Sequence, residues 1–322
     1  MSLPGKIASA LRLMVRFDFA GLGRQWRRHR RQARLQRAGA TPFAHRELGF
    51  PAVCHPAWSD SAAQYLDGHS DAWEFRLLQA WLQAGDQFLD LGANTGLYSY
   101  ATLPTVGPTG RIVAVDAAPF VTGKLELGAR LLGAAQLHAV QAAITETSGE
   151  ITFHVRPDGF LTAEQSLRPD AAQLAGSVAV TVPARTLADL AREQSLGSAL
   201  AAVKIDIEGA EGAALRATPP GWLTADGPLW IVEINPGALI RFAVTPSEIM
   251  ACFPAAHFEC WLLPKHPHDP GTRPALRRAD PADTFADSVY YNFFAIPRGA
   301  RWRVRVSRLA EFFSNSALTH AA

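Results

Sequence analysis

A glycine turn between an apolar run and an amphipathic stretch constrains the fold of this chain more than any other feature. The turn reads Asp-Leu-Gly-Ala-Asn-Thr-Gly over residues 90–96, between the apolar pair 88–89 and the amphipathic residues 97–103. This pattern predicts a strand, a tight turn and a helix, because glycine permits a backbone bend where a side chain would clash. The first N–H groups of such a helix lack partners, and in parallel α/β sheets turns of this kind bind nucleotide-like ligands.

The acid that opens the turn indicates which ligand this is. Asp90 would repel a pyrophosphate but attract a cation, and the turn lacks the Gly-x-Gly-x-x-Gly pattern of dinucleotide-binding proteins. Both observations favour S-adenosylmethionine, whose ammonium and sulfonium groups are positive. We therefore expect Asp90, Gly92, Asn94 and Gly96 to hold the amino-acid end of this cofactor. On this motif alone, an ordinary strand-to-helix turn is the alternative.

A second acid follows where a nucleoside ligand would need it. Residues 111–116 form an apolar run that ends in Asp116. In nucleotide-binding sheets an acid at the end of the second strand accepts hydrogen bonds from the ribose, roughly 20 residues after the glycine turn. We predict that Asp116 binds the ribose and that the adenine lies near Ala143, at the end of a third strand over residues 137–143. Glu74, on the segment before the first strand, is predicted to fold over the cofactor.

The second informative stretch is Val-Lys-Ile-Asp-Ile-Glu-Gly-Ala-Glu at residues 203–211, a predicted strand that runs into a glycine-opened helix. Strand alternation puts Lys204, Asp206 and Glu208 on one face. Burying one cation with two carboxylates is costly unless they pair or bind something. At the carboxyl end of a strand beside the cofactor these groups would face the reacting centre. A salt-bridged strand end that only fixes the loop is the alternative.

The next predicted strand, residues 229–234, delivers further polar groups to the same edge of the sheet. It carries Glu233, and Asn235 follows it. A general base would take the proton of an acceptor hydroxyl, and the candidates are Asp206 and Glu208, with Lys204 setting the local field and Glu233 nearest to them. The alternative is a divalent ion held by Asp206, Glu233 and Asn235, because oxygen ligands suit Mg²⁺.

Positive charge is concentrated at the N-terminus. Residues 1–40 hold ten lysines and arginines and one acid, although the whole chain has a net charge of only +2. Ile7, Leu11, Met14 and Val15 fall at helical spacing, so we predict a basic amphipathic extension that contacts an anionic membrane surface, with a solvated tail as the alternative. No aromatic platform is interleaved with the arginines, and nucleic acid is not expected as a partner.

The bulk composition indicates a cytoplasmic protein, with peripheral contact at the inner membrane face. The chain has no run of 18 apolar residues, so no membrane-spanning helix is expected. Charged residues interrupt the N-terminal apolar stretch, which does not fit a signal peptide. The three cysteines lack metal-ligand spacing, which indicates free thiols in a reducing compartment.

These motifs, in this order, resemble the FkbM family of S-adenosylmethionine-dependent methyltransferases over roughly residues 65–297. Residues 204–211 are the most specific match, and residues 90–96 would fit many methyltransferases. The resemblance implies an α/β, Rossmann-like class I methyltransferase fold. Such a fold has seven strands, mostly parallel with the last one reversed, and helices on both faces. One departure is that the second-strand acid of the family is usually a glutamate followed by proline, so Asp116 is expected to reach only one ribose hydroxyl.

The charge distribution, the motifs and the resemblance, which does not cover residues 1–64, together divide the chain into four predicted parts. They are a basic extension at 1–40, a helical lead-in at 41–85, a methyltransferase domain at 86–300 and a C-terminal tail at 301–322.

The function that the resemblance implies is S-adenosylmethionine-dependent O-methylation of a hydroxyl, most often of a sugar in a glycan or of a glycosylated natural product. The loops at 157–177 and 264–288 would select the small-molecule or glycan acceptor. Two other classes stay open, namely an NAD-dependent oxidoreductase on a similar sheet and a non-catalytic scaffold that acts through its basic N-terminus. Asp90 argues against the first, and the complete acidic stretch at 203–211 argues against the second.

Overall fold

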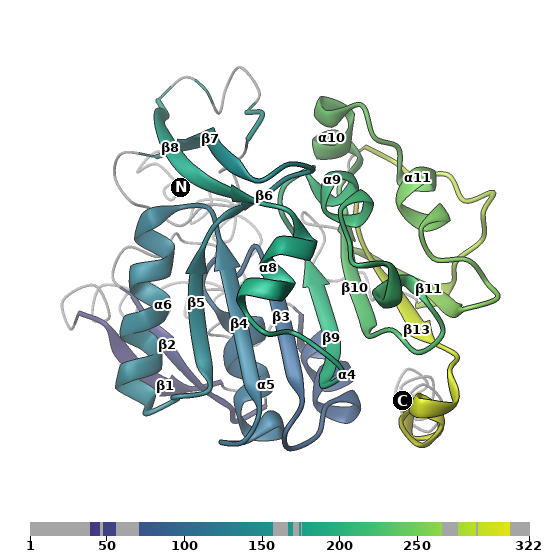
Figure 1. Cartoon of the computed structure of the whole chain (residues 1–322), viewed down its shortest axis with the longest axis horizontal. Helices are drawn as coiled ribbons and strands as arrows, with labels where there is room; N and C mark the ends of the chain where they lie inside the picture. The colour runs from purple at the N-terminus through teal and green to yellow at the C-terminus, as the bar shows by residue number, and fades with distance from the viewer. Residues whose placement is uncertain are drawn as a thin grey trace, which may run out of the picture.

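The computed structural model describes much of the chain between residues 39 and 309. The described residues are 39–45, 48–55, 71–156, 167–169, 174, 176–265, 276–287 and 289–309. They form a central sheet with helices on both faces and a smaller sheet above its carboxyl edge (Figure 1).

Within these residues the central sheet has eight strands in the order β12-β11-β13-β10-β9-β3-β4-β5. Their bounds are Gln87–Leu91 for β3, Arg111–Asp116 for β4, Leu137–Gln141 for β5, Leu200–Ile205 for β9, Leu229–Ile234 for β10, Phe258–Lys265 for β11, Arg277–Arg278 for β12 and Tyr290–Pro297 for β13. Strands β5, β4, β3, β9 and β10 pair in parallel, and β13 runs antiparallel between β10 and β11. This arrangement is the class I methyltransferase fold. The described sheet has one strand more than the seven predicted, because residues 277–278 form a short additional edge strand.

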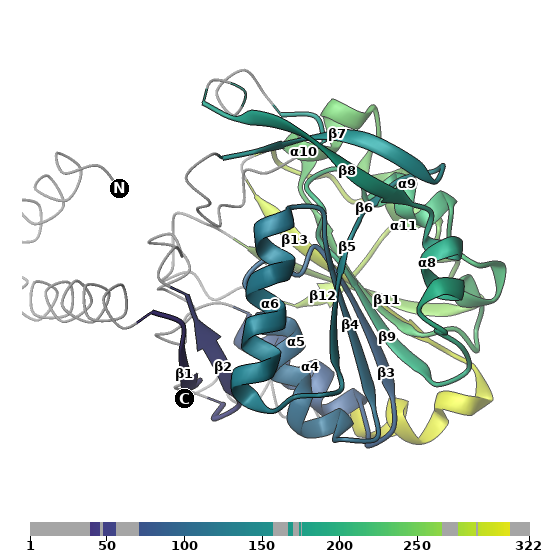
Figure 2. The same cartoon turned by 60° about the vertical axis from the view of Figure 1, so that its left-hand side comes forward.

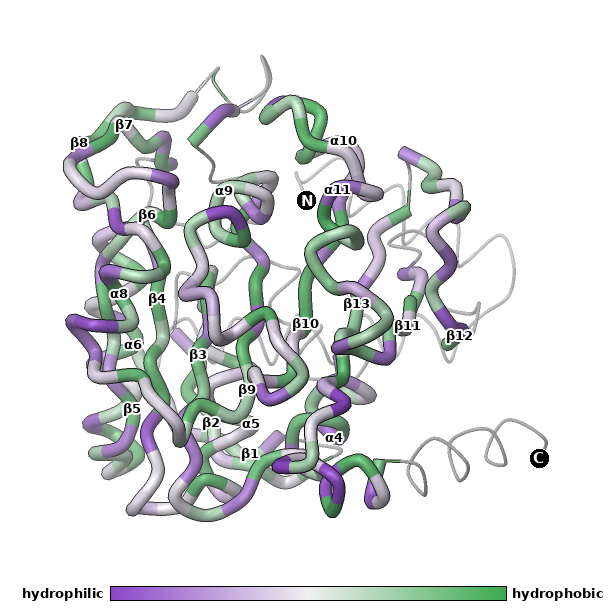
Figure 3. The backbone as a smooth tube through the Cα atoms, turned by 45° about the vertical axis from the view of Figure 1, so that its right-hand side comes forward, coloured by the Kyte–Doolittle hydropathy of each residue, from purple (hydrophilic) through white to green (hydrophobic). Residues whose placement is uncertain are grey.

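Alternation along the central strands produces two hydrophobic cores. Phe88 packs on one face of the sheet and Leu89 on the other, since neighbouring side chains of a strand point in opposite directions. Figure 3 shows hydrophobic residues along β9 and β10. The first face is covered by α4, α5 and α6, and the second by α8, α9 and α11 (Figure 2). The helix bounds are Ala72–Trp81 for α4, Leu97–Val106 for α5, Pro119–Leu132 for α6, Leu187–Glu193 for α8, Glu211–Arg216 for α9, Pro236–Leu239 for α10 and Pro246–Ala251 for α11.

The predicted helical lead-in is wrong in its first part. Strands β1 (Thr41–Ala44) and β2 (Pro51–Cys54) form an antiparallel hairpin that packs against α5 and α6 (Figure 2). The left-handed backbone of Gly49 lies between the two strands, and Val53 is buried. Among the described residues of the lead-in, the helical part is α4.

The predicted third strand is divided between two sheets. Residues 137–141 form β5, whereas β6 (Ala143–Ile144) leaves the central sheet and pairs in parallel with β8 (Val178–Arg185). Strand β7 (Gly149–Val155) pairs antiparallel with β8 and completes a three-stranded sheet. This small sheet lies at the carboxyl edge of the central strands (Figure 1).

Packed structure continues past the predicted start of the tail at residue 301. The short 3-10 helix Ala300–Trp302 leads into helical residues 303–309. Trp302 is buried against Trp81, and Arg305 forms an ion pair with Asp86.

Several predictions fall on residues outside the described part of the chain. These include the basic extension up to residue 38 and much of both predicted acceptor loops. Membrane contact through residues 1–40 therefore stays a prediction. Within the described ranges, no helix combines the length and the apolar character needed to cross a bilayer.

Replacing Gly92 by alanine is expected to destabilise the protein by about 3 kcal/mol or more, because the added Cβ would lie 1.7 Å from the carbonyl oxygen of Asp206 at a φ of 75°. The matched control is Gly123→Ala in α6, where nothing lies within 4 Å and alanine should stabilise the helix by about 0.5–1 kcal/mol. Urea denaturation measures both. A Gly92→Ala variant as stable as the wild type would contradict the packing described here.

Candidate active site

The two glycines of the turn after β3 make room for the protein's own chain. Gly92 lets the end of β3 pass beside the backbone of Asp206, whose N–H donates to the Leu91 carbonyl at 3.0 Å. At Gly96 an added Cβ would lie 2.5 Å from a methyl carbon of Leu125, so this glycine lets α5 start against α6. Gly92 lines the pocket described next, whereas Gly96 does not. The structure therefore gives Gly96 a packing role instead of the predicted place at the cofactor.

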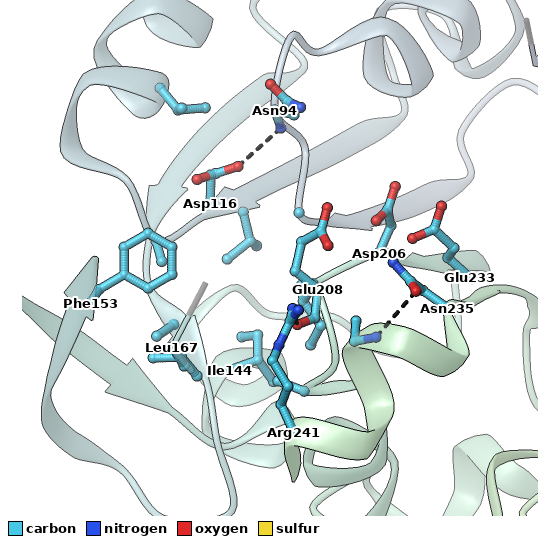
Figure 4. A pocket seen from close by; sticks show the side chains of 18 of the residues that line it. Asn94, Asp116, Ile144, Phe153, Leu167, Asp206, Glu208, Glu233, Asn235 and Arg241 are labelled. Atoms are coloured by element: carbon cyan, nitrogen blue, oxygen red, sulfur yellow. Dashed lines mark hydrogen bonds between the residues drawn. The ribbon is translucent and has the colours of Figure 1, made fainter. Parts of the chain in front are cut away.

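A pocket of about 620 Å³ opens at the carboxyl edge of the parallel strands (Figure 4). This is the size of a small-molecule site, and it lies where ligands bind in open α/β sheets. Its lining comes from the ends of β3 and β4, from the small sheet, and from the segments after β9 and β10. The predicted residues among the lining are Gly92, Asn94, Asp116, Ala143, Asp206, Glu208, Glu233 and Asn235.

Asp116 presents a buried carboxyl group at one end of the pocket. Its two oxygens accept hydrogen bonds from the backbone N–H groups of Asn94, at 3.0 Å, and Ala118, at 2.9 Å. Burial raises its pKa to about 6, although both hydrogen bonds act in the opposite direction. The side-chain oxygen of Asn94 is buried beside it and has no hydrogen-bond partner among the described residues.

The walls next to Asp116 are apolar. Ala143 and Ile144 come from β6, Phe153 comes from β7, and Leu167 completes this side (Figure 4). The ring of Phe153 and the neighbouring aliphatic groups offer a surface for a flat, weakly polar ring.

Lys204 lies behind the pocket between two carboxylates. Its Nζ is 3.1 Å from Asp206 and 3.9 Å from Asp90, and it lies 4.6 Å from the ring centre of Tyr98. Burial alone would lower the pKa of Lys204, but the two carboxylates outweigh burial and raise it. Asp90 is fully buried and accepts a hydrogen bond from Ser99 at 2.7 Å, and burial raises its pKa. Neither Asp90 nor Lys204 lines the pocket, so both act from behind it.

Three carboxyl groups converge where the ends of β9 and β10 meet the pocket. One oxygen from each of Asp206, Glu208 and Glu233 lies within 4.8 Å of the others. Burial and the charge of Asp206 raise the pKa values of Glu208 and Glu233 well above the usual range. Carboxylates this close together repel one another, so this cluster either retains protons or accepts a cation.

Strand alternation does not bring these acids together, and that part of the prediction is wrong. Strand β9 ends at Ile205, and Glu208 has a left-handed backbone with a φ of 56°. Glu211 holds this loop, because its Oε1 accepts hydrogen bonds from the N–H groups of Ile207 at 2.9 Å and Gly209 at 3.2 Å. Burial raises the pKa of Glu211 to about 7.

A comparison with known protein families establishes the family of this chain. Residues 90–260 match the model of the methyltransferase FkbM domain. The chain belongs to the FkbM methyltransferase family. The match confirms the resemblance carried by residues 90–96 and 204–211, and with it the prediction of an S-adenosylmethionine-dependent methyltransferase.

Solved structures of methyltransferases show a more distant likeness. The methyltransferase FkbM from Methylobacillus flagellatus KT is 14% identical with a TM-score of 0.38, and the match covers 66% of this chain and 43% of that one. The chain thus spans less than half of that protein. An O-methyltransferase from Thermotoga maritima is 13% identical, with coverages of 70% and 65% and a TM-score of 0.34. A methyltransferase from Aquifex aeolicus is 11% identical, with coverages of 73% and 96% and a TM-score of 0.35. No curated protein matches the chain significantly.

Glu74 of this FkbM methyltransferase does not reach the pocket, contrary to prediction. It is buried in α4, where it accepts a hydrogen bond from Asn292 at 2.5 Å and pairs with Lys265 at 2.6 Å. Lys265 also pairs with Asp71 at the start of α4. These contacts tie α4 to β11 and β13, which is a structural role.

Asn235 lines the pocket, but its oxygen is engaged elsewhere. Its Oδ1 accepts a hydrogen bond from the N–H of Ala238 at 3.1 Å and caps α10 (Figure 4). The carboxylates that converge are therefore those of Asp206, Glu208 and Glu233, which differs from the predicted metal set by one ligand.

Sequence reasoning missed pocket residues that come from irregular segments. Arg241 lies in a 3-10 turn (Ile240–Phe242) after α10, Asp287 precedes β13, and Tyr290 is the first residue of β13. None of them belongs to a motif of fixed spacing. The only sequence signal was that the segment after Asn235 must cross the carboxyl edge of the sheet.

The affinity of this methyltransferase for S-adenosylhomocysteine is expected to fall below pH 6. The pKa of Asp116 is raised to about 6, so below that pH the carboxyl group takes up a proton, and it loses both its negative charge and one of the oxygens that could accept from the ribose. The loss should approach tenfold per pH unit and disappear above about pH 7. Calorimetric titration between pH 5 and 8 measures it. The Asp116→Asn variant should bind more weakly and show a flatter profile, and equal wild-type affinities at pH 5 and 7.5 would contradict the role of Asp116.

Proposed function

We propose that this protein methylates a hydroxyl group of a sugar, in a glycan or a glycosylated natural product, with S-adenosylmethionine as the methyl donor. The observation that carries the proposal is the cluster of Asp206, Glu208 and Glu233 in the same pocket as a site suited to a nucleoside. A protonated sugar hydroxyl is a poor nucleophile, and a carboxylate beside the cofactor can take its proton. Family membership supports methyl transfer, and the acid cluster supports oxygen as the acceptor atom.

The cofactor half of the pocket fits the adenosyl group. Asp116 can accept a hydrogen bond from a ribose hydroxyl, and the apolar wall of Ile144, Phe153 and Leu167 suits the adenine. Gly92 and Asn94 border the place where the amino-acid end would lie, and Asp90 contributes negative charge from behind. When bound, S-adenosylmethionine supplies a methyl group on a positively charged sulfur.

The acceptor half supplies the base. In this proposal Asp206 takes the hydroxyl proton, and Lys204 fixes the position of its carboxylate at 3.1 Å. Glu233 lies within 4.8 Å of Asp206 and contributes to the electrostatic environment of the base. Alignment of the acceptor oxygen can contribute on the order of 7–11 kcal/mol, and general-base help adds roughly 100- to 10,000-fold to the rate.

The Asp206→Asn variant is expected to lose between 100- and 10,000-fold in turnover, because its amide cannot accept the acceptor proton. Its affinity for S-adenosylhomocysteine should stay within about threefold of the wild type, since Asp116 and the apolar wall are untouched. Release of S-adenosylhomocysteine in the presence of glycan fractions measures turnover, and calorimetry measures affinity. Glu150→Gln, an exposed carboxylate on β7, is the control. Unchanged turnover in Asp206→Asn would remove Asp206 from the mechanism.

Mg²⁺ is the alternative way to activate the hydroxyl, because three carboxylate oxygens within 4.8 Å of one another are ligands that this ion accepts. The base mechanism predicts that exhaustive dialysis against EDTA leaves turnover unchanged, since Lys204 already supplies a positive charge beside Asp206. A loss of tenfold or more that Mg²⁺ restores, at unchanged S-adenosylhomocysteine affinity, would replace the base mechanism by a metal-assisted one.

A further inference from the structure

Arg241 is the cationic residue of the pocket lining that the mechanism does not use. It lies in the 3-10 turn after α10, and its side chain is directed toward Glu208 (Figure 4). One of its terminal nitrogens donates to the Glu208 carbonyl. The guanidinium therefore lies beside the acid cluster, which the proposed function assigns to the acceptor.

The hydrogen-bonding capacity of Arg241 is largely unused. One terminal nitrogen donates to the backbone carbonyl of Glu208 at a long 3.4 Å, and its Nε is buried without a hydrogen-bond partner in the described structure. No described carboxylate lies within 4.0 Å of its guanidinium. A donor that lacks a hydrogen-bond partner is costly. A ligand group that accepts hydrogen bonds from this guanidinium is therefore favoured.

The neighbouring acids do not fulfil this role. Lys204 is the partner of Asp206, and the third acid, Glu233, lies within 4.8 Å of Asp206 and Glu208. The pKa of Glu208 stays well above its usual range even with Arg241 nearby, so Arg241 does not hold this group as a paired carboxylate. The positive charge of Arg241 is therefore available to a ligand.

A second guanidinium reinforces the positive charge of the same turn. Arg168 follows the pocket residue Leu167, donates to the Arg241 carbonyl at 3.1 Å and packs 5.0 Å from the ring centre of Phe242. Tyr290 also lines the pocket, is 38% exposed and carries an aromatic ring that a sugar could pack against. Arginine binds carboxylates and phosphates with two parallel hydrogen bonds, which sets orientation as well as affinity.

We propose that Arg241 binds an anionic group of the acceptor, so that the substrate class is an acidic sugar whose ring carries a carboxylate or a phosphate. This inference rests on the proposed function and specifies its acceptor. Anchoring the anionic group at Arg241 leaves the other face of the ring toward Asp206, where a hydroxyl can lose its proton. The same anchor favours acidic over neutral sugars, because a carboxylate or phosphate accepts two charge-assisted hydrogen bonds from a guanidinium, whereas a neutral hydroxyl accepts weaker ones.

Ligand-observed NMR on the full-length protein saturated with S-adenosylhomocysteine tests the proposal. The probes are D-glucuronate, D-glucose 6-phosphate and D-glucose. We expect at least one anionic probe to bind tenfold or more tightly than glucose. A preference for glucuronate identifies a carboxylate as the anchored group, and a preference for glucose 6-phosphate identifies a phosphate. Equal binding of all three probes, or no binding by the folded protein, would overturn the proposal.

Three variants separate an anchor from a general charge effect. Arg241→Met should reduce the anionic preference to within about twofold of glucose and leave the affinity for S-adenosylhomocysteine unchanged. Arg168→Met should reduce it less, since this residue is exposed and acts through its charge. Arg303→Met, an exposed arginine in helical residues 303–309, matches the charge change and should have no effect. An anionic preference that survives in Arg241→Met would refute the anchor.

Two outcomes identify other failures. A tenfold loss of S-adenosylhomocysteine affinity in Arg241→Met would assign Arg241 to the carboxylate of the cofactor and overturn the acceptor proposal. Failure of the wild type to bind S-adenosylhomocysteine would instead overturn the proposed function. In that case the anionic preference is measured without cofactor, so the two results remain distinguishable.

Discussion

The close approach of the β3 and β9 ends is the constraint on which the rest of the site depends. The backbone of Gly92 passes so near the carbonyl of Asp206 that no side chain fits between them. This contact brings the turn that borders the cofactor half within reach of the loop that carries Asp206 and Glu208. Any displacement of one strand would move the two halves of the pocket apart, and alignment between donor and acceptor would be lost.

Charge behind the pocket supports this geometry. Lys204 is buried between Asp90 and Asp206, and its terminal nitrogen also donates to the carbonyl of Gly92 at 3.4 Å. One cation thus ties together both strand ends and the turn. Burying it is tolerable because two carboxylates compensate it, while removing Lys204 would leave both carboxylates without a counter-charge in a low dielectric. The ion pair between Lys204 and Asp90 also explains how Asp90 supports the geometry of the site although it does not line the pocket.

The elements that were predicted correctly from the sequence are those whose strand and turn residues determine them locally. The bounds of β4 and β10 were predicted correctly, because each is a short apolar run between turn residues. Predictions failed where tertiary contacts decide. Glu74 pairs with Lys265 from a distant strand, and β6 leaves the central sheet to pair with β8. Arg241 could not be predicted as a pocket residue, since only the path of the chain after α10 brings it there.

Two non-glycine residues with left-handed backbones, Asn94 and Glu208, line the pocket from its two halves. Asparagine tolerates this conformation, but for glutamate it costs on the order of 1–3 kcal/mol. Glu211 compensates, because its carboxylate accepts from the N–H groups on either side of Glu208 and fixes the loop. The last acid of the sequence stretch at 203–211 therefore does not belong to the chemistry itself. It holds Glu208 in a conformation that places a third carboxyl beside Asp206 and Glu233, where ordinary strand geometry would not have put it.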